Sequence, residues 1–308
     1  MKTNTQTCKK IIYILLLFIA VSGVAWWYFS EEDQTPTSVK TTAETADFQM
    51  VTSGYVPYTL TREIAGPKAQ ITMLVPPGVE PHHFEPTPGS IIAVQNADVF
   101  IYVSQRIEPW VEDILQGLPN VNSVEAGPSL TDADPHVWMT PYGALAMAKR
   151  IEAALSKADP AHKKMYKQNL RRFEKQMQQL HTDFTTGLAH CKSRDLVHIG
   201  HLAFSALAAT YDLQLQALSG VSHQGEHSVY KLTGMVRFVR HRKLTAVFTE
   251  EMVSPQLAQT VAKEAHVKIL PLYTIEEISK EEFDRGVSYE EYMRRNLKNL
   301  QEGLQCPA

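Results

Sequence analysis

Short apolar runs alternate along the chain with longer stretches in which apolar residues recur at helical spacing. The runs that are apolar enough to be buried strands are residues 70–75, 97–103, 195–199, 213–218, 246–249 and 267–270. Runs of this length, bounded by polar residues, are typical of strands covered on both faces. Strands that alternate with helices predict an α/β fold.

The longest helical stretch lies between the two groups of strands. Asp159 can cap it, Pro160 suits its first turn, and the apolar positions that follow are Met165, Leu170, Phe173, Met177 and Leu180. A helix from there to about residue 188 would be roughly 40 Å long. We therefore predict two α/β lobes, each a mostly parallel sheet flanked by helices, joined by one long rigid backbone helix. The expected N-terminal lobe is 47–141, the helical segment 142–189 and the C-terminal lobe 190–308.

Residues 1–30 form a separate segment. Lys2, Lys9 and Lys10 precede an uncharged apolar run at residues 11–29, which ends in Trp26-Trp27-Tyr28-Phe29. Its length approaches the roughly 30 Å of a bilayer core, and the aromatic end is typical of a membrane interface. We expect an uncleaved membrane anchor, with a cleaved signal peptide as the alternative because Gly23-Val24-Ala25 offers small residues. Both alternatives place the rest of the chain outside the cytoplasm.

Residues 31–46 are polar and predict a tether rather than a domain. In an oxidising compartment the two cysteines beyond it, Cys191 and Cys306, either pair or remain buried thiols. The sequence leaves both alternatives open.

Composition adds few constraints. The chain has 308 residues, 44% of them hydrophobic, which suffices for two domains with real cores. A formal charge of −3 gives no reason to expect a nucleic-acid partner. Basic residues gather at Lys163, Lys164, Lys167, Arg171, Arg172 and Lys175, and we interpret this run as the solvated face of the long helix.

Three histidines carry the candidate chemistry. They are His82 in GVEPHHFEPTP, His136 in DPHVWMTP and His201 in HIGHLAF. Neutral imidazole is the commonest biological zinc ligand, and three imidazoles suffice for a tetrahedral site with one open position. Because the three lie far apart in sequence, they can meet only if the fold brings them together, which suits a site between two lobes.

These motifs stand in a wider series. The other members are Asn96-Ala97-Asp98, Glu108-Pro109-Trp110, Phe248-Thr249-Glu250 and Ser288-Tyr289-Glu290-Glu291-Tyr292-Met293 with Asn296. In this order and spacing the chain, from about residue 47 to 305, resembles the helix-spined zinc- and manganese-binding solute-binding proteins of bacterial ABC importers. The resemblance implies metal ligands at His82, His136 and His201. Imidazole at the third position favours zinc, whereas a carboxylate there suits manganese better, so we expect Zn²⁺ with Mn²⁺ as the weaker candidate.

The fourth ligand position departs from the family pattern. Relatives carry an aspartate after the last strand, where this chain has Leu270. Either water completes the shell or another side chain does, and Glu276 and Glu277 are near in sequence without a feature that places them at the metal. We expect a weaker site than in four-ligand relatives, with an affinity that falls as the pH drops through about 6.5, the ordinary histidine pKa.

Other polar residues receive structural interpretations. His83 is a less favoured substitute for His82, and His198 is expected to be a packed strand residue. His223 and His227 are interpreted as surface-loop residues, with an auxiliary metal-collecting loop as the alternative. The resemblance implies that Glu108 and Glu250 line the lobe interface without binding the ion.

The implied function is capture of a divalent metal between two lobes and its delivery to an ABC-importer permease, by a periplasmic or extracytoplasmic monomer tethered through residues 11–29. The chain is not expected to be an enzyme. A metal-binding surface adhesin is an alternative. A His₃ zinc hydrolase is a weaker one, because the chain has no His-Glu-x-x-His motif and no nucleophile elbow.

Overall fold

Residues 48–127, 134–220, 229–250 and 255–307 are described by the computed structural model and belong to one unit that begins at Phe48. The expected anchor and tether, and the loop with His223 and His227, lie outside these ranges. Within the described ranges, no helix combines the length and apolarity needed to cross a membrane.

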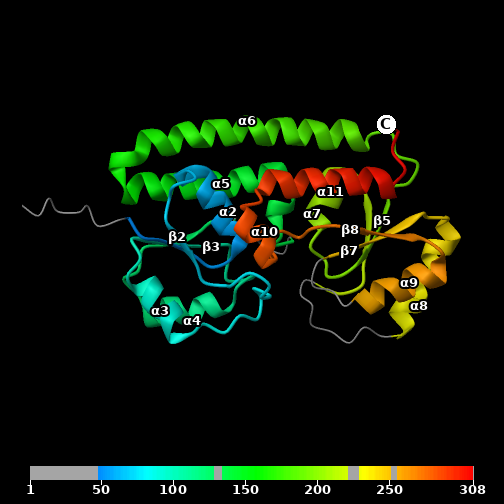
Figure 1. The fold of residues 1–308 in the computed structure, drawn as a ribbon, viewed down its shortest axis with the longest axis horizontal. Coiled ribbons are helices and arrows are strands. Elements are labelled where there is room, and N and C mark those ends of the chain that lie inside the picture. Colours follow the sequence, from blue (N-terminus) through cyan, green and yellow to red (C-terminus); the bar gives the residue numbers. More distant parts are fainter. Residues whose placement is uncertain (1–47, 128–133, 221–228, 251–254, 308) are drawn as a thin grey trace, which may run out of the picture. The chain divides into compact units, whose positions relative to one another are not determined.

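A four-stranded parallel sheet forms the first half of this unit (Figure 1). The strand order is β2-β1-β3-β4, made by β1 (Met50–Thr52), β2 (Ile71–Met73), β3 (Val99–Tyr102) and β4 (Ser123–Glu125). The central strand β3 is buried along its whole length, whereas the edge strand β4 is polar and partly exposed. The helices of this half are α2 (Tyr55–Ala65), α3 (Pro88–Gln95) and α4 (Trp110–Gly117).

The second half repeats this arrangement with a second parallel sheet. Its order is β6-β5-β7-β8, made by β5 (Asp195–Ile199), β6 (Gln214–Ala217), β7 (Ala246–Thr249) and β8 (Lys268–Pro271). The helices of this half are α7 (Ser205–Thr210), α8 (Val229–Arg242) and α9 (Pro255–Ala265). They are followed by α10 (Lys280–Arg285), which packs on α2 of the first half, and by the C-terminal helix α11 (Tyr289–Gly303). The prediction of an α/β fold with two parallel sheets is confirmed.

Two long helices join the halves: α5 (Pro141–Ala158) and α6 (Lys163–Leu188), entered through the short 3₁₀ turns η1 (Val137–Met139) and η2 (Pro160–His162). The long helix therefore begins three residues later than Pro160. Asp159 does not cap it, because the Asp159 carboxylate accepts hydrogen bonds from the His162 ring and the Tyr166 hydroxyl.

One hydrophobic core runs beneath both sheets. It contains residues of β1, β3, β5 and β7 together with the buried faces of α2, α5, α6 and α11. On the opposite faces, α3 and α4 cover the first sheet and α8 and α9 cover the second, each pair over its own smaller cluster (Figure 1). Because the large core is shared, the two halves are held by packing as well as by the connecting helices.

The chain returns to the first half after β8. Along residues 272–288 the Thr274 carbonyl accepts from Trp138 Nε1 (2.9 Å), and the Ile278 carbonyl accepts from the Gly78 amide (2.8 Å). Further along, the Val287 carbonyl accepts from the Tyr55 hydroxyl. This return segment gives the lobes a second covalent connection.

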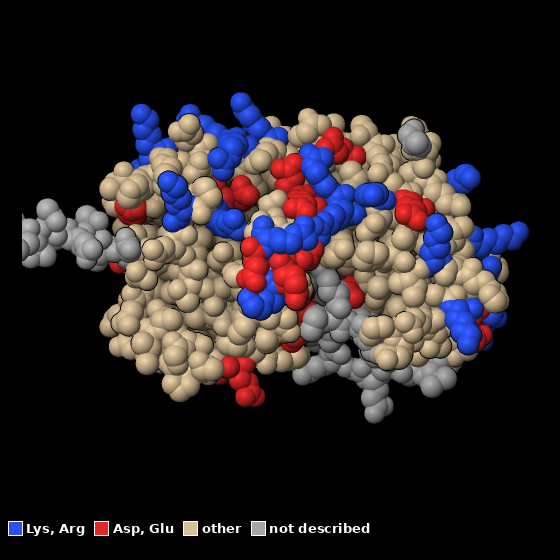
Figure 2. Space-filling model, viewed as in Figure 1, with Lys and Arg blue, Asp and Glu red and all other residues tan. Residues whose placement is uncertain are grey.

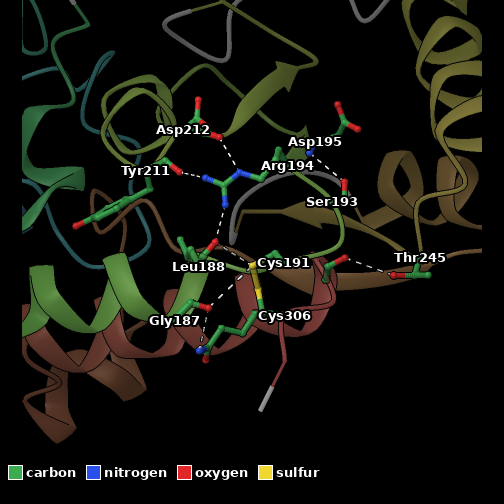
Figure 3. Close-up of a disulfide and its surroundings, with 12 residues drawn as sticks. Gly187, Leu188, Cys191, Ser193, Arg194, Asp195, Tyr211, Asp212, Thr245 and Cys306 are labelled. Carbon is green, nitrogen blue, oxygen red and sulfur yellow. Dashed lines mark hydrogen bonds between the residues drawn. A yellow bond between two sulfur atoms is a disulfide. The ribbon is translucent and has the colours of Figure 1, made fainter.

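A disulfide joins Cys191, just beyond α6, to Cys306, just beyond α11 (Figure 3). The cysteines are 115 residues apart in sequence. Beside the bond, the Lys192 amide donates to the Gln305 carbonyl and the Ser193 amide donates to the Leu304 carbonyl. The disulfide thus fixes the C-terminus to the end of the long helix, and the pairing that the sequence left open is present.

Removing this bond is expected to lower stability without changing the fold. The chain-entropy model assigns about 4–5 kcal/mol to a loop of this length, and we expect Cys306→Ser to lower the free energy of unfolding by about 2–5 kcal/mol. Urea denaturation of wild type and variant, each with and without a thiol reductant, measures the effect. Reductant should destabilise the wild type and leave the variant unchanged; a wild type insensitive to reductant would contradict the prediction.

Candidate metal centre

The candidate ligands lie beyond the carboxyl ends of the strands, which is where open α/β sheets bind their ligands. His82 lies in the loop after β2, and His136 follows β4 and directly precedes η1. His201 follows β5, and Glu276 lies in the return segment after β8. The predicted histidines therefore come together from both sheets, and a glutamate joins them.

These four side chains meet in a buried cluster in which one donor atom of each lies within 4.8 Å of all the others. His82 is 6% exposed, His136 0%, His201 1% and Glu276 5%. The Glu276 carboxylate is 3.2 Å from His82 Nε2, 3.5 Å from His136 Nε2 and 3.1 Å from His201 Nε2. Each imidazole therefore presents its Nε2 atom to one common centre.

The opposite nitrogen of each ring is held by an acceptor. His82 Nδ1 donates to the Ile107 carbonyl (2.9 Å), and His136 Nδ1 lies 2.6 Å from the Asp134 carboxylate. His201 Nδ1 lies 2.8 Å from the Glu250 carboxylate. A proton on Nδ1 leaves the Nε2 lone pair free, which is how such acceptors orient histidine ligands and increase their basicity.

The donor-atom distances from Glu276 to each histidine, and the distance between His136 and His201, match those of a tetrahedral zinc ion. Bonds of about 2.0–2.1 Å in tetrahedral geometry place neighbouring ligand atoms about 3.3 Å apart. The Nε2 atoms of His136 and His201 are 3.3 Å apart, and the distances to Glu276 are close to the same value. His82 Nε2 and Glu276 Oε1 are buried without hydrogen-bond geometry, as two ligands of a shared cation would be.

The carboxylates around the cluster change the acidity of the histidines. Burial opposes protonation of His82, but the Glu276 carboxylate outweighs it and raises the pKa of His82 to about 9. Burial acts in the same way on His201, where the Glu250 and Glu276 carboxylates raise the pKa to about 10. Without metal the site therefore retains protons well above pH 6.5, the value expected from an unperturbed histidine.

Glu276 experiences the reverse effect. Burial would raise the pKa of its carboxyl, but the neighbouring histidines hold that pKa well below its usual range. Its neighbour Glu277 lacks this compensation, so burial and the nearby carboxylates raise the pKa of Glu277 to about 8. Of the two adjacent glutamates, Glu276 is the ionised one and has the charge that a dication requires.

The fourth ligand was not assigned from the sequence because it was expected at position 270. Leu270 lies within β8, paired with Phe248, and its side chain belongs to the shared core. The chain reaches the candidate metal centre only six residues after Leu270, at Glu276. Of the two alternatives, water or another side chain as the fourth ligand, the geometry agrees with the side chain. The only sequence signal was the presence of two adjacent acidic residues in the segment.

The backbone before Glu276 is unusual. Ile275 has a φ of 66°, a left-handed conformation that is a genuine outlier for a β-branched residue, and its side chain is fully buried. The Thr274 carbonyl is held by Trp138, whose ring contacts His136 at a centroid distance of 5.2 Å. Trp138 thus connects the loop that carries His136 to the loop that carries Glu276.

Other polar residues support the ligands. The Glu250 carboxylate also accepts from the His201 amide (2.9 Å), and a side chain at Gly200 would collide with it at 2.2 Å. Glu108 is buried, accepts from the Val103 amide (2.7 Å) and is not among the four clustered donors. His198 is packed, with Nδ1 donating to the His201 carbonyl (3.1 Å), and His83 is exposed.

Relatives of known function resemble this chain along most of its length. The high-affinity zinc uptake system protein ZnuA of Bacillus subtilis (strain 168) is 30% identical over 278 residues, 83% of this chain and 87% of that protein. The zinc-binding lipoprotein AdcA of Streptococcus pneumoniae (strain R6) is also 30% identical, over 82% of this chain but only 55% of AdcA. The chain thus spans little more than half of that relative.

Solved structures resemble it as well. The Zn(II)-bound ZnuA-like domain of Streptococcus pneumoniae AdcA has a TM-score of 0.74 at 31% identity, covering 84% of this chain and 99% of that domain. The laminin binding protein Lmb of Streptococcus agalactiae, described as bifunctional with adhesin and metal transporting activity, has a TM-score of 0.76 at 32% identity, covering 83% and 99%. Residues 50–303 match the family model for the periplasmic zinc-uptake complex component A. The chain belongs to the ZnuA family.

Proposed function

We propose that this protein is an extracytoplasmic solute-binding protein that captures Zn²⁺ with His82, His136, His201 and Glu276 and delivers it to the permease of an ABC importer. The observation that carries the proposal is the meeting of four buried donor atoms from both lobes, all within 4.8 Å of one another. The zinc-uptake relatives support the same function. In this proposal the ion is cargo rather than a resident cofactor.

The donor set favours zinc over manganese. Three imidazoles and one carboxylate suit a borderline-soft ion in tetrahedral geometry, whereas Mn²⁺ prefers a shell rich in oxygen. The Glu276 carboxylate supplies one negative charge to the dication. Glu250 and Asp134 supply two more through the rings of His201 and His136.

Transport fits the coordination better than catalysis does. Catalytic zinc keeps one position open for water, whereas here four protein side chains fill a tetrahedral shell. A closed shell binds an ion without activating a nucleophile. The closed shell therefore favours a carrier over an enzyme. We further propose that the protein is a monomer, held near the membrane by residues 11–29.

Attachment to a host surface is a second candidate function, favoured by the likeness to the laminin-binding protein Lmb. Binding of the full chain to immobilised laminin, with and without zinc, tests it independently of transport.

Removing any one of the four ligands should weaken zinc binding at least about 100-fold. Loss of a mere supporting partner already costs about 10–100-fold, so loss of a direct bond costs more. Zinc titration of His82→Ala, His136→Ala, His201→Ala and Glu276→Gln measures the effect. Glu277→Gln is the matched control and should bind within a few-fold of wild type. Equal losses in Glu276→Gln and Glu277→Gln would refute the assignment of Glu276.

Leu270→Asp should destabilise the protein and leave zinc affinity no higher. The substitution buries an uncompensated carboxylate against Phe248 and Gly303, at a cost of about 3 kcal/mol or more. Thermal unfolding and zinc titration of the variant check both parts. Tighter zinc binding by this variant would show that a carboxylate at position 270 reaches the ion, which contradicts the assignment of the fourth ligand to Glu276.

Zinc affinity should rise with pH from 7 to about 9. Because the pKa values of His82 and His201 are raised to about 9 and 10, both rings are protonated at pH 7 in the metal-free state and must release protons on binding. Calorimetry in buffers of different ionisation enthalpy should detect more than one proton released per zinc at pH 7. An affinity that is constant from pH 7 to 9 would contradict this linkage.

A further inference from the structure

The exposed side of α6 carries a row of five basic residues near its N-terminal end. All five side chains are exposed, and we call them the basic row: Lys163, Lys164, Lys167, Arg171 and Lys175. Lys163, Lys167, Arg171 and Lys175 follow one another at intervals of four residues, and Lys164 lies three residues before Lys167, which places the row along one side of the helix. The row covers roughly 18 Å of the helix at 1.5 Å per residue. Figure 2 shows basic side chains gathered over this part of the molecule.

This arrangement is electrostatically unfavourable in isolation. Like charges at positions i and i+4 repel one another, and cations near the N-terminus of a helix oppose its dipole. In the described part of the chain, no carboxylate lies within salt-bridge distance of the row, and the one acidic residue among its positions, Glu174, pairs with Lys149 (3.1 Å).

Several cations on other surfaces are paired. On α11, Arg294 lies 2.9 Å from Asp183 and 2.8 Å from Glu290. Lys280 pairs with Asp284 and Lys268 with Glu302, at 2.8 and 2.9 Å. The row differs from single unpaired surface lysines in that five neighbouring basic residues share one side of a helix, and an anionic partner outside the chain would neutralise them together.

The form of the row indicates an extended partner rather than a small anion. Its side chains are exposed along one side of α6, with the exposed Met165 among them. A row of cations with an apolar side chain suits the interface of an anionic bilayer, which attracts basic surfaces within about 10 Å at moderate salt.

The position of the row also suits a membrane. Asn169, beside the row, donates to the Ile64 carbonyl at the end of α2. Because α2 connects two parallel strands, it starts at the carboxyl edge of the first sheet and ends at the amino edge. The row therefore lies near the amino edge of this sheet. The chain enters the unit at this same edge, just before Met50. The inference rests on the proposed function, in which residues 11–29 hold the protein at the membrane and the chain leads from them into this edge of the unit.

We propose that the basic row rests the protein on the anionic phospholipid surface of the membrane to which it is tethered. Because the metal ligands lie at the opposite edges of the sheets, this resting orientation directs the metal centre away from the bilayer. The protein then collects zinc from solution in one orientation and turns over to deliver it.

The test uses the full chain in vesicles, with the body on the outer side, made either of phosphatidylcholine alone or with about one third phosphatidylglycerol. A water-soluble amine reagent labels the lysines, and mass spectrometry measures each labelling rate. We expect Lys163, Lys164 and Lys167 to react about fivefold more slowly on the anionic vesicles. Each basic residue near such a surface gains about 1 kcal/mol, which corresponds to a factor of about five between its bound and its free, reactive state. Lys280, 76% exposed elsewhere, is the internal control. In 1 M salt the protection should disappear.

Two double variants complete the test. Arg171→Gln with Lys175→Gln should remove most of the protection at the three remaining lysines, whereas Lys268→Gln with Lys280→Gln should leave it unchanged. Zinc titration should give the wild-type affinity in both, so a failure of the membrane proposal is distinct from a failure of the proposed function. Equal labelling in the two kinds of vesicle would overturn the proposal. So would protection by soluble polyphosphate but not by anionic lipid, which would identify a polymeric partner.

Discussion

The attraction between the Glu276 carboxylate and the three imidazoles is the interaction on which the site depends. A buried carboxylate is costly unless it is compensated, and the compensation here comes from the protons of the metal-free site or from the ion that replaces them. Because Glu276 lies on the segment that returns from the second lobe, this electrostatic requirement also holds that segment against the first lobe. The contact between Glu276 and the three imidazoles therefore both balances the buried charge and connects the two lobes.

The fold places this contact without specialised secondary structure. Every ligand follows the carboxyl end of a strand, and the two sheets are set by a shared core so that these ends converge. The residues that orient the rings, Ile107, Asp134 and Glu250, come from the loops of the same edges. Rigid strands thus hold the first positions of each loop, and short polar contacts fix the remaining freedom of each side chain.

Much of the fold and three of the four candidate ligands could be predicted from the sequence, because the spacing of apolar residues indicates which faces of helices and strands are buried. Six strands, the long helix and the three histidines all stood in apolar or distinctive contexts. The strands β1 and β4 were missed because neither lies in a longer apolar run: β1 reads Met-Val-Thr and β4 reads Ser-Val-Glu, whereas the equally short β2 continues into Leu74 and Val75. On the long helix, Phe173, Met177 and Leu180 are buried as expected, but in the first turn Tyr166 is buried and Met165 is exposed. Glu276 was beyond reach, because its position depends on a segment that crosses between lobes and on hydrogen bonds such as that of Trp138.

The left-handed backbone at Ile275 has a consequence for the release of the ion. A β-branched residue held in this region costs about 1–3 kcal/mol, which the surrounding contacts must supply while Glu276 points at the centre. The contacts that hold this conformation are the hydrogen bond from Trp138 to the Thr274 carbonyl and the ion pairs between Glu276 and the histidines. Loss of either contact is favoured by relaxation of the backbone, whereas the lobes themselves are held by a common core. We therefore expect the segment that carries Glu276 to move before the lobes do when the ion leaves.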